Sequence, residues 1–416
     1  MKTFTVFFCG TGSNHLDFDL PRVDHETGAI DPSTSSYHAG ELVSTLAAHH
    51  AGQEFVDWIV VDGPGSGNLR EDEKWIEPGE YVHQWATATG AGWGENVQHA
   101  LAVLKGEVVY ERRDHTSQEV AILEDAGIAP RTEERSRFLG LGSKDVPVRK
   151  VTPQELQARK AAIFREAGDW DAIHVIGWSR GAVTCHMFAG ALFEDETLRD
   201  VPVYLFAVDP VPGPFNFTRE RTTLQRNVAS YVGVYAVHEM TTGFNPVLPA
   251  THPDTRRTIL PFPGRHATLA GNARSDGGRA LPDVFQAPGI VVRDLAEKYL
   301  TAWGTPLNGR LELSDRQLLE QYDAMLAQAA AYEGLRRHVY AGFRPFEDSV
   351  RWVGAGTDLT WTRFDHVPEF RTGRIFVNAH HEALAVQAMG AELPELRRRQ
   401  AEVMAMPGEA RVQAVT

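Results

Sequence analysis

The sequence contains little cysteine and no excess of basic residues. Only Cys9 and Cys185 occur among 416 residues. Both lie in apolar surroundings, so we expect two buried free thiols and not a disulfide framework. The formal net charge of −14 argues against a nucleic-acid partner, because contacts to phosphates need a basic surface. No apolar run reaches the length of a membrane span, and the sequence shows no internal repeat.

The N-terminus lacks the long apolar core and the small-residue cleavage site that define a signal peptide. Its short apolar run, residues 4–8, predicts a first β-strand instead. We therefore expect the protein to be cytoplasmic when it is made, and any action outside the cytoplasm to need another export route. Hydrophobic residues make up 43% of the chain, which is enough for a packed core.

Strand-like and helical patterns alternate through the first two thirds of the chain. The predicted strands are Thr3–Phe8, Phe55–Val61, Ala172–Ile176, Pro202–Val208, Val232–Val237 and Arg257–Phe262. The predicted helices between them are Glu41–His50, Gly94–Lys105, Pro153–Ala167 and Ala182–Phe193. This alternation predicts an α/β fold, with a mostly parallel sheet covered by helices on both faces. In such sheets ligands bind at the edge formed by the loops that follow the strands.

Two regions depart from the alternation. Residues 106–150 are charged and weakly periodic, and we interpret them as an inserted, helical subdomain that resembles a lid in its position. Further along, helical patterns cover Ser314–Ala331 and the region near Glu382–Gln400. These patterns predict a helical C-terminal extension.

The stretch DAIHVIGWSRGAV, residues 171–183, carries the clearest chemical signal. Ser179 lies between a predicted strand and a predicted helix, with Gly177 and Gly181 two positions away on either side. This is the G-x-S-x-G pattern of a nucleophile elbow, in which the turn is so tight that the flanking positions need glycine. The pattern predicts that Ser179 is a nucleophile exposed at the carboxyl edge of the sheet.

A serine nucleophile needs an acid and a histidine, which follow it in this order in an α/β-hydrolase. Asp209 ends the next predicted strand and precedes a proline-rich turn, where a carboxylate can orient a histidine. A turn-capping role is the alternative for this residue, and Glu239, at the end of the following strand, is the rival acid.

Among the 17 histidines, His266 has the position that a general base requires. It follows a predicted strand and a Pro-Gly turn, and it comes after both Ser179 and Asp209. The remaining candidates are ordinary by position: His174 in a strand, His186 on a helix, and His380 and His381 near the C-terminus.

The oxyanion formed by such a nucleophile needs two N–H donors. One is expected to be the backbone amide of Arg180, directly after the serine. The second is expected from the bare loop FFCGTGSN, near Thr11 or Gly12. A phosphate-binding loop is the weaker alternative, because no lysine follows at the required spacing. The sequence shows no metal-ligand motif, and the predicted chemistry needs no cofactor.

The segments FFCGTGSN, VVDGPGSGN, GWGENVQHALAVL, GWSRGA, VDPV and FPGRH, in this order, resemble the bacterial α/β-hydrolase family that contains the Tle1-like lipase effectors of type VI secretion. The resemblance runs from residue 3 to about 305. It implies an α/β-hydrolase catalytic domain at 1–305, interrupted at 106–150, and leaves 306–416 as the C-terminal extension. Cys9 stands where that family usually has aspartate, and His266 is followed by Ala-Thr-Leu where the family has Ser-Asp-Val.

The resemblance implies an esterase or phospholipase in which Ser179 is the nucleophile, Asp209 the acid and His266 the base. It also implies delivery into the periplasm of a rival cell, with a spike protein and an immunity protein as partners and at most peripheral membrane contact. Two alternatives stay open. One is a non-catalytic α/β-hydrolase scaffold that serves as a binding module, and the other is a housekeeping intracellular esterase.

Overall fold

The fold is known from a computed structural model of the 416-residue chain. The structure describes residues 2–13, 15, 17–18, 40–54, 56–64, 92–106, 132–136, 143–147, 170–214, 216–273, 285–339, 350–356 and 359–370. The predicted helices Pro153–Ala167 and Glu382–Gln400 lie outside the described residues, as do His380 and His381.

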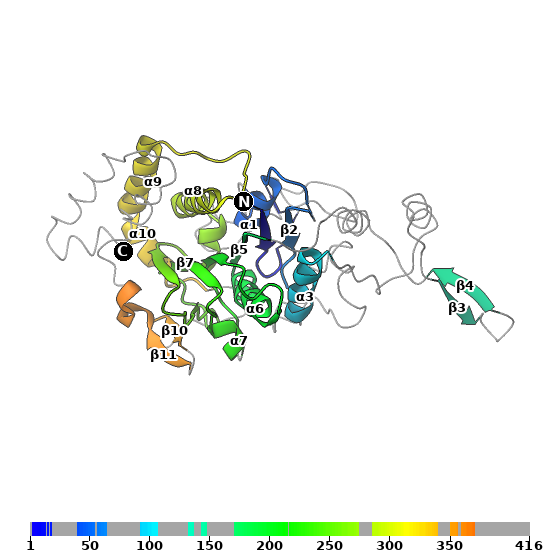
Figure 1. Cartoon of the computed structure of the whole chain (residues 1–416). Coiled ribbons are helices and arrows are strands. Elements are labelled where there is room, and N and C mark those ends of the chain that lie inside the picture. Colours follow the sequence, from blue (N-terminus) through cyan, green and yellow to red (C-terminus); the bar gives the residue numbers. More distant parts are fainter. Residues whose placement is uncertain are drawn as a thin grey trace.

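The core of the fold is a six-stranded sheet in which every neighbouring pair is parallel (Figure 1). Its strands are β1 Thr3–Phe8, β2 Trp58–Val61, β5 Ala172–Trp178, β6 Val203–Val208, β7 Val228–Ala236 and β9 Arg256–Phe262. Their order is β2-β1-β5-β6-β7-β9, so the direction of winding reverses between β1 and β5. Each strand overlaps a predicted one, and the α/β prediction is confirmed.

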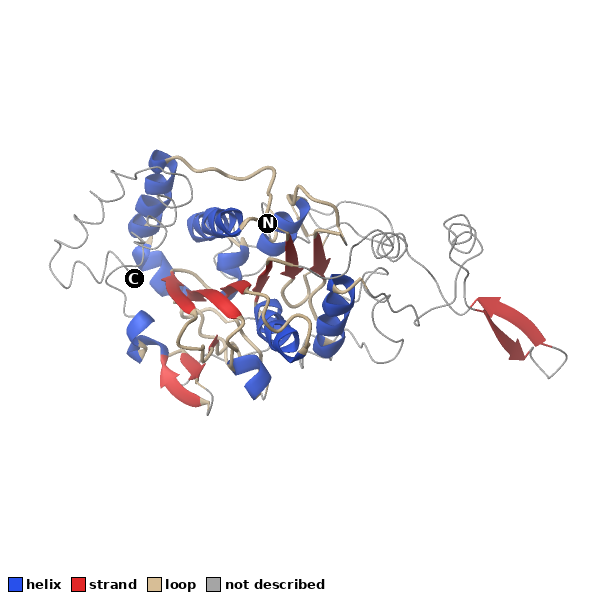
Figure 2. Cartoon of the chain, viewed as in Figure 1, coloured by secondary structure: helices blue, strands red, loops and turns tan. Residues whose placement is uncertain are grey.

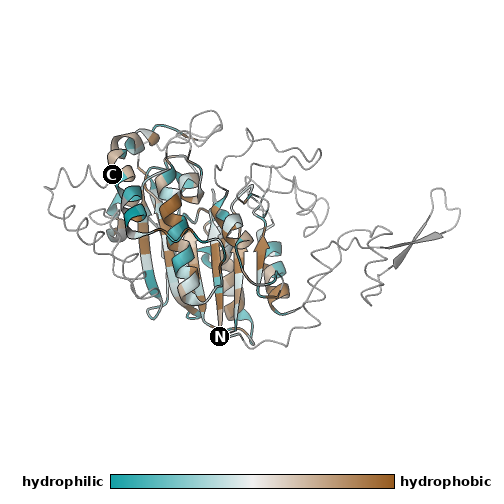
Figure 3. Cartoon of the chain, turned by 90° about the horizontal axis from the view of Figure 1, so that it is seen from above, coloured by the Kyte–Doolittle hydropathy of each residue, from teal (hydrophilic) through white to brown (hydrophobic). Residues whose placement is uncertain are grey.

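The strands are apolar because both faces of the sheet are covered. All seven residues of β5 are buried, and the hydrophobic colours concentrate on the strands in Figure 3. His174 inside β5 is part of this core. Its Nδ1 lies 2.7 Å from Thr305 Oγ1, and burial lowers its pKa to about 4, so the ring stays neutral at physiological pH.

Helices pack on both sides of the sheet (Figure 2). They are α1 Leu42–Ala48, α3 Trp93–Leu104, α6 Arg180–Glu194, the short α7 Arg219–Thr222, α8 Gln286–Trp303, α9 Asp315–Ala327 and α10 Ala329–Leu335. Figure 1 shows α1 and α8 on one face, and α3 and α6 on the other. Among the described residues, no helix is both long enough and apolar enough to cross a membrane.

The region after residue 305 is only partly helical. The helix α9 lies within the predicted Ser314–Ala331, and α10 begins within it but ends four residues beyond it. In contrast, β10 Trp352–Ala355 and β11 Thr360–Arg363 are strands, followed by the 3₁₀ turns Phe364–His366 and Pro368–Phe370. Together with β8 Val247–Leu248 they form a second sheet of order β11-β10-β8. The domain division at residue 305 stays a prediction. Backbone hydrogen bonds join its two sides, for example from the Gly354 N–H to the Pro246 carbonyl at 3.0 Å.

The predicted helical insertion at 106–150 is corrected where the structure describes it. The strands β3 Thr132–Ser136 and β4 Ser143–Pro147 pair in antiparallel register, with Thr132 opposite Pro147. The physical reason lies in the missing helical period of this charged segment: without an apolar face to dock a helix, the backbone hydrogen bonds are made across a hairpin.

Candidate active site

Ser179 occupies a sharp turn between β5 and α6. Its backbone has φ +57° and ψ −128°, a conformation that favours glycine. A Cβ atom on Gly177 would lie 2.6 Å from the carbonyl carbon of Gly181, and one on Gly181 would lie 2.2 Å from the backbone oxygen of Phe8. These close approaches explain why glycine flanks the serine.

Asp209 leaves the sheet beside Ser179. Trp178 and Val208 are partners in the register of β5 and β6, so the residues that follow them emerge at the same level of the same edge. The serine N–H donates to the Val208 carbonyl at 2.9 Å, which joins the two strand ends. Asp209 also has a positive φ, +42°, and is fully buried.

His266 meets Asp209 from the far side of the sheet edge. It begins the 3₁₀ helix His266–Ala270 after β9, and its Nδ1 lies 2.6 Å from Asp209 Oδ2. With the aspartate ionised, Nδ1–H is the donor, which leaves Nε2 as the basic nitrogen. Nε2 is buried and has no hydrogen-bond partner among the described residues. The imidazole is therefore oriented by Asp209 with its second nitrogen available.

Two aromatic rings hold the His266 imidazole in place. The rings of Trp178 and Phe244 both have their centroids 5.1 Å from it. Trp178 directly precedes Ser179, so the histidine lies against the elbow. The structure describes no hydrogen bond of the Ser179 hydroxyl, to His266 or to any other described residue. In proteins without substrate such catalytic hydrogen bonds are often long and form only in the complex.

Glu239, the rival acid, contacts the backbone of His266 instead of its ring. Its Oε2 accepts the His266 N–H at 3.2 Å, and its Oε1 accepts the Thr241 N–H at 2.7 Å. Arg265 Nε lies 3.6 Å from the same carboxylate. Of the two candidate acids, only Asp209 reaches the imidazole.

Sequence reasoning missed Arg351. Its guanidinium forms a two-point contact with Asp209, from Nη1 to Oδ1 at 2.9 Å and from Nη2 to Oδ2 at 2.7 Å. Burial alone raises the pKa of Asp209, but Arg351 and His266 overcome this effect and lower it to about 2. The aspartate is thus ionised throughout the physiological range. No motif surrounds Arg351, so the sequence offered no signal for this contact.

The predicted oxyanion donors have different surroundings. The Gly12 N–H already donates to the Pro64 carbonyl at 3.0 Å, so this donor does not fit its predicted role. The Thr11 N–H has no hydrogen-bond partner among the described residues, and Thr11 Oγ1 accepts a bond from Arg180 Nη1 at 3.1 Å. Burial lowers the pKa of Arg180 to about 10. The backbone amides of Thr11 and Arg180 stay predictions.

Cys9 and Cys185 are free and buried, as predicted, and burial raises the pKa of both thiols. Within the part of the chain that the structure describes, no three His, Cys, Asp or Glu side chains are grouped to hold a metal ion.

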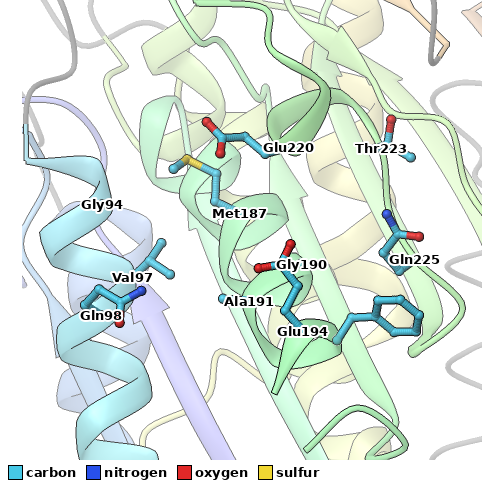
Figure 4. A pocket seen from close by; sticks show the side chains of 11 residues that line it. Gly94, Val97, Gln98, Met187, Gly190, Ala191, Glu194, Glu220, Thr223 and Gln225 are labelled. Atoms are coloured by element: carbon cyan, nitrogen blue, oxygen red, sulfur yellow. The ribbon is translucent and has the colours of Figure 1, made fainter. Parts of the chain in front are cut away.

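A surface pocket of about 240 Å³ lies elsewhere, between α3 and α6 (Figure 4). Its lining includes Val97, Met187, Glu194 and Glu220, and none of Ser179, Asp209 and His266. This pocket is therefore separate from the site described above.

No protein-family model and no curated protein matches the chain. Solved structures are similar to it at low identity, and two of them are described next. The Tle1 effector bound to the VgrG spike from the Type 6 secretion system aligns with 65% of this chain and 50% of its own, at 12% identity and a TM-score of 0.31. An uncharacterized protein from Pseudomonas aeruginosa aligns with 99% of this chain and 56% of its own, at 13% identity and a TM-score of 0.36.

The aligned regions thus span about half the length of these two proteins. One of them is a Tle1 effector, the kind of protein whose motifs the sequence resembles. At these TM-scores neither likeness carries an argument about this chain, so its proposed function rests on its own residues.

Proposed function

We propose that the protein is a serine hydrolase of α/β-hydrolase fold that cleaves carboxylic esters, with phospholipids as its substrate class. The observation that carries this proposal is the 2.6 Å contact between His266 Nδ1 and Asp209 Oδ2. It lies at the sheet edge where Ser179 is held at positive φ between a strand and a helix. The switch in winding between β1 and β5, where ligands bind in such sheets, is at the same edge.

In the proposed mechanism His266 Nε2 takes the proton of the Ser179 hydroxyl as its oxygen attacks the ester carbonyl. Asp209 stabilises the imidazolium that forms. The backbone N–H groups of Arg180 and Thr11 donate to the oxyanion of the tetrahedral intermediate. His266 then gives its proton to the leaving alcohol, which produces an acyl-enzyme. A water molecule, deprotonated by the same nitrogen, attacks the acyl-enzyme and releases the acid.

The phospholipid substrate and the effector role rest on the order of motifs in the sequence, from the loop after β1 to the histidine loop. The partners that this proposal implies are a lipid or ester substrate, a secretion spike protein and an immunity protein. It also implies transfer from the cytoplasm of the producing cell to the periplasm of a target cell. A spike-protein or immunity gene beside this gene favours the effector over a housekeeping esterase.

The test is hydrolysis of a panel of phospholipids and short-chain esters by the wild type and by Ser179→Ala, combined with labelling by a fluorophosphonate probe. Ser230→Ala is the matched control, because Ser230 is also buried but lies within β7, away from the edge. We expect phospholipid cleavage and labelling to be lost only in Ser179→Ala. Serine-dependent cleavage of short esters alone would reject the phospholipid substrate. A wild type that neither labels nor cleaves would overturn the proposal in favour of the non-catalytic scaffold.

A further inference from the structure

Arg351 is a fully buried cation that reaches the candidate site from a part of the chain outside the resemblance. We propose that Arg351 is a positioning residue that holds the Asp209 carboxylate turned toward His266, so that the hydrolase site extends to Arg351, directly before β10. This inference rests on the proposed function, because a positioning role has meaning only if Asp209 and His266 act on a substrate.

The contacts around Asp209 fix the plane of its carboxylate. Oδ1 accepts from Arg351 Nη1 at 2.9 Å and from the Ala236 N–H at 3.1 Å. Oδ2 accepts from Arg351 Nη2 at 2.7 Å and from His266 Nδ1 at 2.6 Å. Each oxygen therefore has two donors, and rotation of the carboxylate would break several charge-assisted hydrogen bonds at once. Without the guanidinium, half of these donors are lost.

The guanidinium is itself held firmly. Nη1 also donates to the Ala236 carbonyl at 2.6 Å, and Nε and Nη2 donate to the Phe244 carbonyl at 3.2 and 2.8 Å. Phe244 packs its ring against His266, so one residue connects the arginine and the imidazole in a second way. A buried arginine with all three nitrogens hydrogen-bonded is well suited to fixing a carboxylate.

The segment that carries Arg351 is anchored at two places after this residue. In β10, Gly354 and Ala355 pair with Val247 and Leu248 of β8. Further on, Phe370 packs against Tyr235 of β7, with ring centroids 4.7 Å apart. These contacts place the segment against β8 and β7. The strand β7 pairs with β6, which precedes Asp209, and with β9, which precedes His266.

The charge of the cluster gives the inference a measurable consequence. Asp209 and neutral His266 together carry one negative charge in a buried place, and Arg351 neutralises it. When the guanidinium is removed, the remaining anion attracts a proton more strongly, so the Asp209–His266 pair takes up a proton at higher pH. The protonated pair is inactive as a base, so the acid limb of the kcat/KM profile moves to higher pH.

Titratable groups on the neighbouring elements form pairs of their own. The pairs are Arg265 with Glu239 at 3.6 Å, His238 with Glu333 at 3.2 Å, and Tyr231 with Tyr235 at 3.0 Å between their hydroxyls. Burial raises the pKa of both tyrosines, which stay neutral at physiological pH. Among the described residues, Arg351 is the arginine or lysine whose side chain contacts the Asp209 carboxylate.

The first experiment measures kcat/KM against pH for a soluble p-nitrophenyl ester, with rates normalised to the fraction of protein labelled by a fluorophosphonate. We expect Arg351→Met to lose about tenfold to hundredfold in kcat/KM. In this variant, the midpoint of the acid limb of the kcat/KM profile is expected to rise by about one pH unit or more. Arg351→Lys keeps the charge and should return the limb to the wild-type position. Arg363→Met, in the same segment but paired with Asp365 outside the site, is the matched control.

The inference is wrong if Arg351 only stabilises the fold. In that case Arg351→Met would lower the labelled fraction while the normalised profile kept its wild-type limb. Should Arg351→Met fail to fold, Arg351→Gln carries the same test, because its amide still donates to the carboxylate but adds no charge.

A second experiment separates this inference from the proposed function. Protein with isotope-labelled histidine and the Ser179→Ala change is titrated with pH and followed by NMR, with and without Arg351→Met. The His266→Gln variant identifies the imidazole signal of His266. We expect the His266 midpoint to be higher in Arg351→Met than with Arg351 present. Absence of serine-dependent hydrolysis in the wild type would reject the proposed function and with it a positioning role in catalysis. Hydrolysis with an unmoved midpoint would reject the inference alone.

Discussion

Arg351 and Asp209 lie 142 residues apart in the sequence and form a two-point ion pair in which both side chains are fully buried. Such a pair is costly to break on one side, because the remaining charge stays buried without compensation. The pair therefore has a testable effect on stability that does not depend on any activity.

We expect Asp209→Asn and Arg351→Met each to lower the free energy of unfolding by about 3–5 kcal/mol. The double variant removes both charges, so it should cost clearly less than the sum of the two single changes. Urea unfolding of all four proteins measures this coupling. Additive losses would show that the two side chains do not stabilise one another.

The two acids at this edge should differ strongly in their effect on turnover. Asp209→Asn is expected to lower kcat by about 10⁴-fold, because an amide cannot hold the imidazole in the required tautomer. Glu239→Gln removes one of two acceptors of backbone N–H groups, worth about 1 kcal/mol, and should cost about tenfold or less. Steady-state kinetics on one ester substrate compares them directly, and equal losses would reopen the choice of acid.

The backbone at Ser179 should be strained. Glycine adopts a positive φ without the penalty that a side chain pays there, so Ser179→Gly is expected to be more stable than Ser179→Ala by about 1 kcal/mol. Neither variant should hydrolyse esters. Thermal unfolding of the two proteins is the measurement, and an alanine variant at least as stable as the glycine variant would contradict the strain.

Two glycines of α6 offer a matched pair. A Cβ on Gly181 would lie 2.2 Å from the Phe8 carbonyl oxygen, whereas one on Gly190 has nothing within 4 Å. Gly181→Ala should therefore be strongly destabilised, by about 2 kcal/mol or more, through overpacking. Gly190→Ala should gain about 0.5–1 kcal/mol from helix propensity. Denaturant unfolding of both variants tests this, and similar effects would mean that the elbow is looser than described.

Glu41 should make stability depend on pH. It is fully buried, Ser44 donates to its Oε2 from both N–H and Oγ–H, and burial raises its pKa from 4.5 to about 7. Between these values the native protein keeps a proton that the unfolded chain releases, so stability falls as pH rises through this window. The loss is about 3 kcal/mol for a shift of this size.

Glu41→Gln should abolish this loss, because the amide is neutral at every pH. Urea unfolding at pH 5, 6, 7 and 8 measures the effect, with the exposed Glu220→Gln as control. We expect the stability difference between Glu41→Gln and wild type to grow toward pH 8. A constant difference would argue that Glu41 does not change its protonation on folding.

The sheet could be predicted because its strands are largely apolar runs separated by helical patterns. The run VYLFAV before Asp209 is an example, and it is β6 in the structure. Ser179 could be predicted for a different reason: its two flanking glycines are imposed by atoms within van der Waals distance, and that constraint is visible as a motif. Local sequence patterns were thus enough to select Ser179, Asp209 and His266 as candidate site residues.

What the sequence did not reveal depends on contacts between distant segments. Arg351 carries no pattern of its own, and its contact with Asp209 joins segments 142 residues apart in the chain. The loop sequence likewise does not show that the N–H of Gly12, a predicted oxyanion donor, donates to the Pro64 carbonyl. The choice between Asp209 and Glu239 likewise needed the position of the imidazole ring, because both acids follow neighbouring strands and differ only in what they face.

The position of Arg351 in the chain also sets the order in which the site is completed during synthesis. The ribosome makes Ser179, Asp209 and His266 well before Arg351, and domains begin to fold from the N-terminal side. Until the segment that leads into β10 has left the ribosome, the buried carboxylate has no guanidinium partner. A nascent chain therefore carries the three predicted residues without the ion pair, and a protein proposed to cut lipids gains its complete site only late in translation.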